Sequence, residues 1–358
     1  MATSTYKTIA NDDVTNTRTL LHEAIPLTGT IVSGTYYINS SDTQTNIKRY
    51  AHGMFESVYD YPYLSSSANH IFDVTVGYSN QSHLSSSTNN TNSEKIQIYN
   101  EMAQVLAGYD QTGSIRRFDQ NGDFTDGGNK LDEVFFVNYA RLLNKDEMKK
   151  GSYILNMYTA GTIKAPTTPL PFGDYGAADS YKTNSPAGEY GILYTSSAVP
   201  LSDGTSGIGL LYYQAGIAVL TASVFTSPFG PNTDIGVSRH GASAGGVDAC
   251  ITGSTITSSC EGFRNCWEDN DFNNTTELNS TIYFCRAEHN EFNYSSNPTY
   301  VTASKIRVKN QALDQPVSYV TTIGLYSQNN ELLAVAKLSE PNKKTATNEI
   351  TYRVRLDY

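Results

Sequence analysis

The stretch Asn348–Tyr358, NEITYRVRLDY, carries the clearest secondary-structure signal in the chain. Apolar or aromatic residues occupy every second position, and Thr, Arg and Asp fill the positions between them. Successive side chains of a β-strand point to opposite faces, so this alternation predicts a strand with one buried and one exposed face. The predicted inward set is Ile350, Tyr352, Val354, Leu356 and Tyr358.

Three further strand-like runs precede this stretch. They are YVTASKIRVK (300–309), VSYVTTIGLYS (317–327) and ELLAVAKLS (331–339). The second and third are joined by Gln328-Asn329-Asn330, which is typical of a hairpin turn. The pattern predicts an antiparallel β unit over residues 299–358.

The N-terminal segment, residues 1–110, is predicted to be β-rich with one main helix. Residues 29–39 and 70–79 are rich in β-branched and aromatic side chains, which favours strands. The helix is expected to follow Ser93 as N-cap, because apolar residues then recur at helical spacing. Gly108 lies where a glycine commonly ends a helix.

Two shorter helices are expected from less regular patterns. One would start behind Asn16 or Thr17 and end before Pro26, because proline interrupts a helix. The other would run from about Leu131 to Lys145, where Val, Phe, Tyr and Leu recur at roughly helical intervals.

Residues 111–298 form the predicted middle region. Strands are expected at 188–197 and 209–225, and the second of these should break into two around Gln214-Ala215-Gly216. Residues 230–298 are rich in Gly, Asn and Ser and are expected to be irregular, except for one strand at Thr281–Cys285.

These patterns together predict a mainly β chain with a few short helices, a β-rich α+β fold. We expect segments 1–110 and 299–358 to form an antiparallel β-sandwich. The middle region, 111–298, would be inserted into it with a helix, strands and cysteine-containing loops, and would project contact loops.

The composition favours protein contacts over nucleic-acid binding. The net charge is −10, whereas nucleic-acid binding needs a basic surface. Basic residues exceed acidic ones from about residue 300 onward, so the acidic excess lies upstream. The 26 tyrosines suit protein interfaces, although tyrosine is also common in β-sheets.

Membrane insertion and secretion are not expected. The N-terminus has no apolar segment typical of a secretory signal. The apolar run Ile208–Phe225 is short for a membrane span and contains Gln214 and glycines, which favours two buried strands. The four cysteines, Cys250, Cys260, Cys266 and Cys285, lack Cys-x-x-Cys spacing; two disulfides or four reduced thiols both fit, and the reduced form is expected without secretion.

One sequence matches the pattern of a catalytic serine. GASAG at Gly241–Gly245 has Ser243 at its centre and His240 beside it. A nucleophile elbow requires a buried strand before the serine and a helix after it, and neither flank has that character. A flexible loop is the preferred interpretation.

A possible calcium site occurs at Asp119–Lys130, DQNGDFTDGGNK. Asp119, Asn121 and Asp123 fall at the first, third and fifth positions of a calcium loop. The EF-hand pattern fails at Phe124, where glycine is required, and at Lys130, where glutamate is required. The candidate is therefore weak, with Asp126 or Asp132 as further ligands, and an acidic turn is the alternative.

No other catalytic or cofactor motif is present. The six histidines are scattered, and neither a phosphate loop nor a dinucleotide fingerprint occurs. Glu288, His289 and Glu291 lie together, but a polar loop explains them more simply. No catalytic residue, cofactor or metal is therefore predicted, and an enzyme is not expected.

Distinctive stretches of the chain include RTLLHEAIP, SPAGEYGILY, GLLYYQAGIAVLT and TIYFCRAEHNEFNYSSNPTY. They resemble a family of virion structural proteins of contractile-tailed, T4-like phages that infect marine bacteria such as cyanobacteria. The resemblance spans nearly the whole chain and is most distinctive from Phe292 to Tyr358. The ending also resembles T4-type baseplate wedge subunits, as does NHIFDVTVGYS near the N-terminus.

The resemblance implies a structural component of the virion, assembled in the host cytoplasm, and a baseplate wedge subunit is the preferred interpretation. Its partners would be other tail proteins and copies of itself, without nucleic acid or membrane. The alternatives are a neck- or head-associated structural protein, or a host-recognition adhesin of the same particle whose Tyr- and Asn-rich loops bind glycan or envelope protein. The family provides no catalytic residues.

Overall fold

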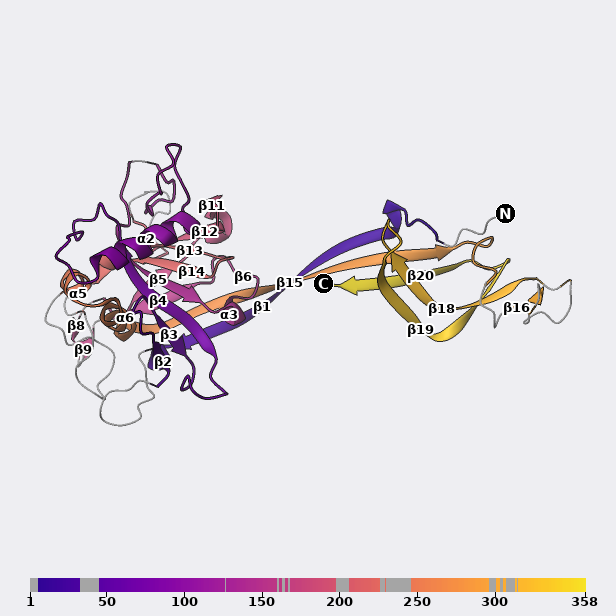
Figure 1. Ribbon diagram of the computed structural model, residues 1–358, viewed down its shortest axis with the longest axis horizontal. Helices are drawn as coiled ribbons and strands as arrows, with labels where there is room; N and C mark the ends of the chain where they lie inside the picture. Colours follow the sequence, from indigo (N-terminus) through magenta and orange to yellow (C-terminus); the bar gives the residue numbers. More distant parts are fainter. Residues whose placement is uncertain are drawn as a thin grey trace. The chain divides into compact units, whose positions relative to one another are not determined.

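The structure is a computed structural model, and its fold is mainly β, with antiparallel sheets and short helices (Figure 1). The predicted mainly β, β-rich α+β class is thereby confirmed. The predicted sandwich of segments 1–110 and 299–358 differs from the sheets of the structure. The strands at Ile47–Arg49, Glu56–Tyr59 and His70–Tyr78 pair in one sheet with strands of the middle region, and those at Val317–Tyr326 and Leu332–Thr345 pair with each other. The residues described are 6–32, 45–125, 127–159, 161–162, 165–166, 168–197, 206–225, 229, 246–295, 301–302, 305–306, 313 and 315–358.

Contacts divide the chain into two compact units. Unit 1 consists of Met1–Leu20 with Glu277–Tyr358, and unit 2 consists of Leu21–Thr276. Unit 1 thus joins the two ends of the chain, and unit 2 is inserted between them. The boundaries differ from those of the predicted segments, 1–110, 111–298 and 299–358, because most of residues 1–110 belongs to unit 2.

Unit 2 is built on an eight-stranded antiparallel sheet. The predicted strand at 70–79 and the strand pair around Gln214-Ala215-Gly216 are confirmed. In spatial order the strands are β11 (Lys182–Ser185), β12 (Gly188–Leu193), β13 (Gly209–Tyr212), β14 (Ile217–Thr221), β5 (Glu133–Tyr139), β4 (His70–Tyr78), β3 (Glu56–Tyr59) and β2 (Ile47–Arg49).

Helix α2 (Asn92–Leu106) covers one face of this sheet at β4. A Cβ atom added to Gly77 would lie 2.9 Å from the backbone nitrogen of Tyr99, so only glycine permits this close packing. The helix agrees with the prediction, and Gly108 follows it with a φ of +78°. The N-cap is Thr91, whereas Ser93 was predicted.

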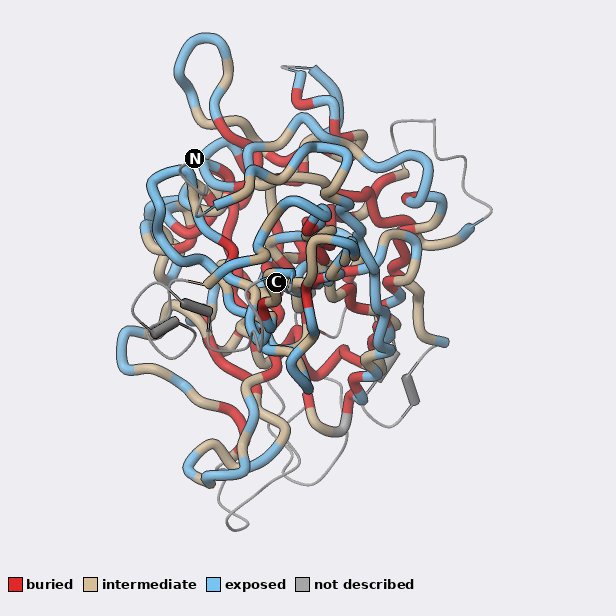
Figure 2. The backbone as a smooth tube through the Cα atoms, turned by 90° about the vertical axis from the view of Figure 1, so that its right-hand side faces the viewer, coloured by how far each residue is buried: buried red, intermediate tan, exposed pale blue. Residues whose placement is uncertain are grey.

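Helix α6 (Ile256–Asn265) and the start of β15 (Trp267–Ala287) pack on the other face, and α5 (Val247–Gly253) contacts α6. Phe263 stacks on Phe135 with ring centroids 4.7 Å apart, and Trp267 stacks on Phe72 at 5.0 Å. Phe72 and Gly77 lie on opposite faces of β4, since side chains alternate along a strand. Both faces of the sheet are therefore covered at β4, whose residues are mostly buried. Figure 2 shows the buried residues of the chain in red.

A second sheet is organised around the long strand β15. Residues of β15 and β1 belong to both units, and β7, β10 and β6 lie in unit 2. The order is β1 (Val14–Thr28), β15, β7 (Ile154–Met157) and β10 (Leu170–Gly173), and β6 (Glu147–Met148) and β20 (Ile350–Asp357) also pair with β15.

In unit 1, the final strand β20 pairs with β15 from Ser280↔Asp357 to Ala287↔Ile350. Exposure along β20 alternates, and Val354 is its buried residue. The half-buried strand predicted from NEITYRVRLDY is confirmed. Tyr358 departs from the predicted inward set, because its side chain is 76% exposed.

The rest of unit 1 is dominated by a hairpin of β18 (Val317–Tyr326) and β19 (Leu332–Thr345). The predicted turn lies between them, and Asn330 has a φ of +62°. Of the predicted strand at 300–309, the structure describes a short pair of strands, β16 (Val301–Thr302) and β17 (Lys305–Ile306).

The remaining elements are short. They are η1 (Asn11–Asp13), α1 (Gly29–Val32), α3 (Arg141–Asn144), β8 (Gly161–Thr162), β9 (Ala165–Pro166), α4 (Ala177–Ser180) and η2 (Ala222–Val224).

Two predicted helices are wrong. The residues between Thr17 and Pro26 lie in strand β1, because pairing with β15 overrides a local helical preference. The predicted helix over 131–145 is strand β5 followed by the short helix α3. Strand β5 is buried on both faces, and so lacks the alternation by which strands are recognised.

Two further expectations differ from the structure. Residues 230–298 were expected to be irregular except for a strand at Thr281–Cys285. That strand is present within the longer β15, but the described part of the segment also holds the helices α5 and α6. The predicted strand at 29–39 begins instead with α1, and residues 33–39 lie outside the described residues. No helix in the described ranges is long and apolar enough to cross a membrane.

Candidate functional site

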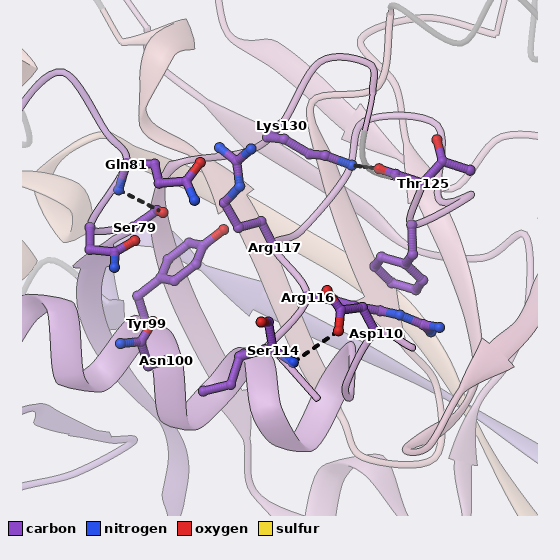
Figure 3. A pocket seen from close by; sticks show the side chains of 13 residues that line it. Ser79, Gln81, Tyr99, Asn100, Asp110, Ser114, Arg116, Arg117, Thr125 and Lys130 are labelled. Carbon is purple, nitrogen blue, oxygen red and sulfur yellow. Dashed lines mark hydrogen bonds between the residues drawn. The ribbon is translucent and has the colours of Figure 1, made fainter. Parts of the chain in front are cut away.

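A polar pocket with a volume of about 470 Å³ lies in unit 2, between α2 and two loops (Figure 3). The loop after β4 contributes Ser79, Asn80 and Gln81, and α2 contributes Tyr99 and Asn100. The rest of the lining comes from the segment between residues 110 and 130. Three separate stretches of sequence therefore meet in one cavity.

Tyr99 anchors the back of the pocket. Its side chain is buried, its hydroxyl donates to the carbonyl oxygen of Leu131 at 2.8 Å, and it accepts from the backbone N–H of Phe118 at 3.2 Å. Phe118 also packs edge-to-face on the Tyr99 ring. These contacts hold the loop that carries Arg116 and Arg117 against α2.

Three cationic side chains line the pocket, and two of them have carboxylate partners. Arg117 Nη1 lies 3.0 Å from each carboxylate oxygen of Asp132. Lys130 donates to Asp119 and to the carbonyl oxygen of Thr125. In Figure 3, Arg117 extends between Gln81 and Lys130.

Arg116 is the third cation, and it differs from the other two. Its Nε atom is buried and has no hydrogen-bond partner among the described residues. A buried donor without a partner is costly, and such groups commonly mark the place of a ligand or an ordered water. The pocket therefore offers one unsatisfied cationic donor.

Among the described residues of the lining, Asp110 is the one carboxylate. It accepts from the hydroxyl of Thr112 at 2.7 Å and from the backbone N–H of Ser114 at 2.9 Å. The hydrogen bond from the Thr112 side chain, with those from the backbone, lowers the pKa of Asp110. Burial raises the pKa of Tyr99. Neither group is therefore poised as an acid or base near neutral pH, and the lining is suited to binding.

The calcium candidates lie in the loop beside this pocket. Asn121 donates its backbone N–H to Asp119 at 3.2 Å, and Asp123 accepts from the N–H and hydroxyl of Thr125 at 2.9 Å. The ammonium group of Lys130 already neutralises Asp119. The described residues contain no group of three His, Cys, Asp or Glu that could hold a metal ion, and Asp126 lies outside them.

The other residues considered as sites are not brought into this pocket. Ser243 and His240 lie outside the described residues. In unit 1, Lys7 forms ion pairs with Glu288 and Glu291 at 3.4 and 2.6 Å. His289 lies 3.4 Å from Glu349. Contacts of this kind order a surface loop.

All four cysteines are free thiols. Cys250, Cys260 and Cys266 are buried, and burial raises the pKa of each. Burial also raises the pKa of Cys285. A thiol with a raised pKa is a poor nucleophile, because the thiolate is the reactive form.

A second candidate site is the surface of unit 1. Five of its twelve described exposed large hydrophobic side chains lie on the β18–β19 hairpin, where the ring of Tyr6 also packs edge-to-face on Tyr326 with centroids 5.0 Å apart. The exposed large hydrophobic residues of unit 1 are Tyr6, Leu20, Leu278, Phe292, Tyr294, Leu313, Tyr319, Tyr326, Leu332, Leu333, Val335 and Tyr358.

Comparison with known proteins gives no match to a family model, to a curated protein or to a solved structure. The polar pocket was not predicted from the sequence. The consecutive pair Arg116-Arg117 within an acidic region was the one local signal that could have pointed to it.

Proposed function

We propose that this chain is a structural subunit of a contractile-tailed bacteriophage virion, placed in the baseplate, and that it acts through protein–protein contacts. The resemblance of its sequence to virion structural proteins of T4-like phages supports a place in the virion. The surface of unit 1 supports the assembly role.

The observation that carries the assembly role is the small core of unit 1. Among its described residues, the buried hydrophobic ones are Ile282, Ala287, Leu325 and Val354. A fully buried aliphatic side chain contributes about 1.5–3 kcal/mol, so this core alone provides little stability for its size. The contiguous core of the protein, by contrast, runs from Leu27 to Phe272, within unit 2.

Three exposed apolar residues of unit 1 lie on one face of the β18–β19 hairpin. Gly324 pairs with Val335, and the nearest side-chain atoms to the position of a Gly324 Cβ belong to Tyr326 and Leu332. Tyr326, Leu332 and Val335 thus lie around Gly324 on one face, with exposures of 45%, 54% and 50%. An apolar face of this kind is typical of a protein interface.

The strand edges and the charge also favour self-association of this face. Within the described part of the chain, β18 and β19 pair only with each other, which leaves their outer edges open to further strands. Unit 1 has 11 basic and 10 acidic residues, a net charge of +1, whereas unit 2 has 14 and 25, a net charge of −11. Contacts between copies of unit 1 therefore meet little net repulsion.

The virion role is tested in purified particles of the phage that encodes the chain. Mass spectrometry should find the protein in particles that remain intact through a density gradient, and a map of the particle should place it in the baseplate. Absence from such particles would exclude a structural role, and a position in the neck or head would exclude the baseplate.

A further inference from the structure

We propose that the polar pocket of unit 2 binds a saccharide that carries a carboxylate or sulfate group. This inference goes beyond the assembly role, because it concerns binding by a single chain. It would give the host-recognition alternative a defined ligand site.

Arg116 is the residue that would receive the acidic group. Its Nε is buried without a partner, whereas Arg117 and Lys130 are already paired with Asp132 and Asp119. An arginine binds a carboxylate or sulfate through two parallel hydrogen bonds, which satisfies Nε together with one terminal nitrogen. A ligand with an acidic group would therefore remove an unfavourable feature of the free pocket.

The rest of the lining fits hydroxyl groups. Gln81 and Asn100 each offer donors and an acceptor, and Ser114 adds a hydroxyl. Asp110, with its lowered pKa, is an acceptor that suits sugar hydroxyls. In Figure 3, the Arg116 side chain extends beside Asp110. One ligand can therefore place its acidic group at Arg116 and a hydroxyl group at Asp110.

The size and the apolar parts of the pocket argue against a free inorganic anion. A volume of about 470 Å³ exceeds what one sulfate fills and falls in the range of small-molecule sites. Phe124 and Ile115 also line the pocket and provide apolar contact for the face of a sugar ring. The lining thus combines the groups that one acidic sugar presents.

The test is a ligand-detected NMR titration of the full chain with glucuronate, with glucose as the neutral comparison and inorganic sulfate as a competitor. Glucuronate should bind saturably, and glucose and sulfate should bind at least about fivefold more weakly. Arg116→Met should weaken glucuronate binding by about tenfold or more, which corresponds to about 1.4 kcal/mol. Arg141→Met, at an arginine that is 71% exposed outside the pocket, is the matched control and should bind like the wild type.

Circular dichroism and thermal unfolding establish that each variant is folded. If Arg116→Met does not fold, Gln81→Ala provides the second test, with a smaller expected loss of about threefold. The proposal is overturned if glucuronate shows no saturable binding, if the pocket variants bind as well as Arg141→Met, or if sulfate binds as tightly as glucuronate. None of these outcomes depends on whether the chain assembles into a virion.

Discussion

Arg264 Nε lies 2.9 Å from Glu56 Oε2, and both side chains are fully buried. The other carboxylate oxygen of Glu56 accepts from Arg49 Nε at 2.7 Å. Arg264 also donates through Nη1 to the carbonyl oxygen of Val32 at 3.1 Å. This network connects α6 to strand β3 and to helix α1, across the face of the large sheet opposite α2.

Removing the charge of Glu56 should destabilise unit 2 strongly. Glu56→Gln removes the carboxylate charge that pairs with the buried Arg264 guanidinium, and breaking a buried ion pair by removing one partner costs about 3–5 kcal/mol. Chemical denaturation followed by circular dichroism measures the loss. Asp146→Asn, at an exposed ion pair with Arg141, is the control and should change the free energy of unfolding by less than about 1 kcal/mol. A similarly small effect of Glu56→Gln would contradict this role.

Lys95 should make stability rise with pH in the alkaline range. Its buried ammonium donates to the carbonyl oxygens of Asn90, Ile251 and Ser254 at 2.6–2.8 Å, and burial lowers its pKa to about 8. In the unfolded chain the pKa is near 10.5. Between these values the unfolded state holds more protons, so the free energy of unfolding should increase with pH, by up to about 3 kcal/mol.

The comparison that isolates this effect is Lys95→Met. Denaturation curves between pH 8 and pH 10.5 should show the free energy of unfolding of the wild type rising relative to that of the variant. Parallel pH profiles would rule out a depressed pKa at Lys95.

Asp174 should make the free energy of unfolding fall as pH rises in the acidic range. Its carboxylate is buried and accepts from the backbone N–H groups of Gly151 and Tyr153 and from the Tyr213 hydroxyl, at 2.7–3.0 Å. Burial outweighs these bonds and raises its pKa to about 6, from 3.8. The folded state then holds more protons between these values, so the free energy of unfolding should fall by up to about 3 kcal/mol as pH rises from 3.8 to 6.

The matched variant is Asp174→Asn, which does not titrate. The wild type should lose stability relative to the variant as pH rises through this window, measured by denaturation at pH 4, 5 and 6. A wild type that gains stability relative to the variant would show that the hydrogen bonds to Asp174 outweigh its burial.

Substitutions on the exposed face of the β18–β19 hairpin can show whether this face is an interface between copies of the chain or ordinary solvent-exposed surface. Leu332→Ser with Val335→Ser should leave the fold of an isolated chain nearly unchanged, because substitutions at exposed positions typically alter stability by less than about 0.5 kcal/mol. If this face is an interface, the same double substitution should weaken self-association by tenfold or more, which corresponds to about 1.4 kcal/mol.

The control for that experiment is Leu142→Ser. Leu142 is 59% exposed in α3 of unit 2, so its exposure matches that of the two hairpin residues. Sedimentation analysis over a range of concentrations should show unchanged association for this variant. Equal effects of the hairpin and Leu142 variants would contradict a specific role of the hairpin face.

The parts of the fold that were predictable are those with a clear local period. Strand β20 alternates because one of its faces packs and the other meets solvent, and α2 shows helical spacing because one of its sides lies on the sheet. Strand β5 is enclosed on both faces, so its run of Val and Phe carries no period. Strand β1 is defined by its partner β15, more than 200 residues away in sequence, and no local pattern encodes that pairing.

The pocket was missed for a related reason. Gln81, Tyr99 and Arg116 come from different elements, and only the folded chain brings them together. The calcium candidate could be found because its residues are adjacent in sequence. Lys130 departs from the calcium-loop pattern, which requires glutamate at that position. In the structure, its ammonium group pairs with Asp119 and neutralises that carboxylate.

The most direct test of the assembly role is the mass of the purified chain in solution, measured by sedimentation equilibrium at several concentrations. The monomer mass is 39.2 kDa. We predict a defined oligomer that dissociates when Leu332 and Val335 are both replaced by serine. A stable, folded monomer of 39.2 kDa at all concentrations would contradict self-association through unit 1.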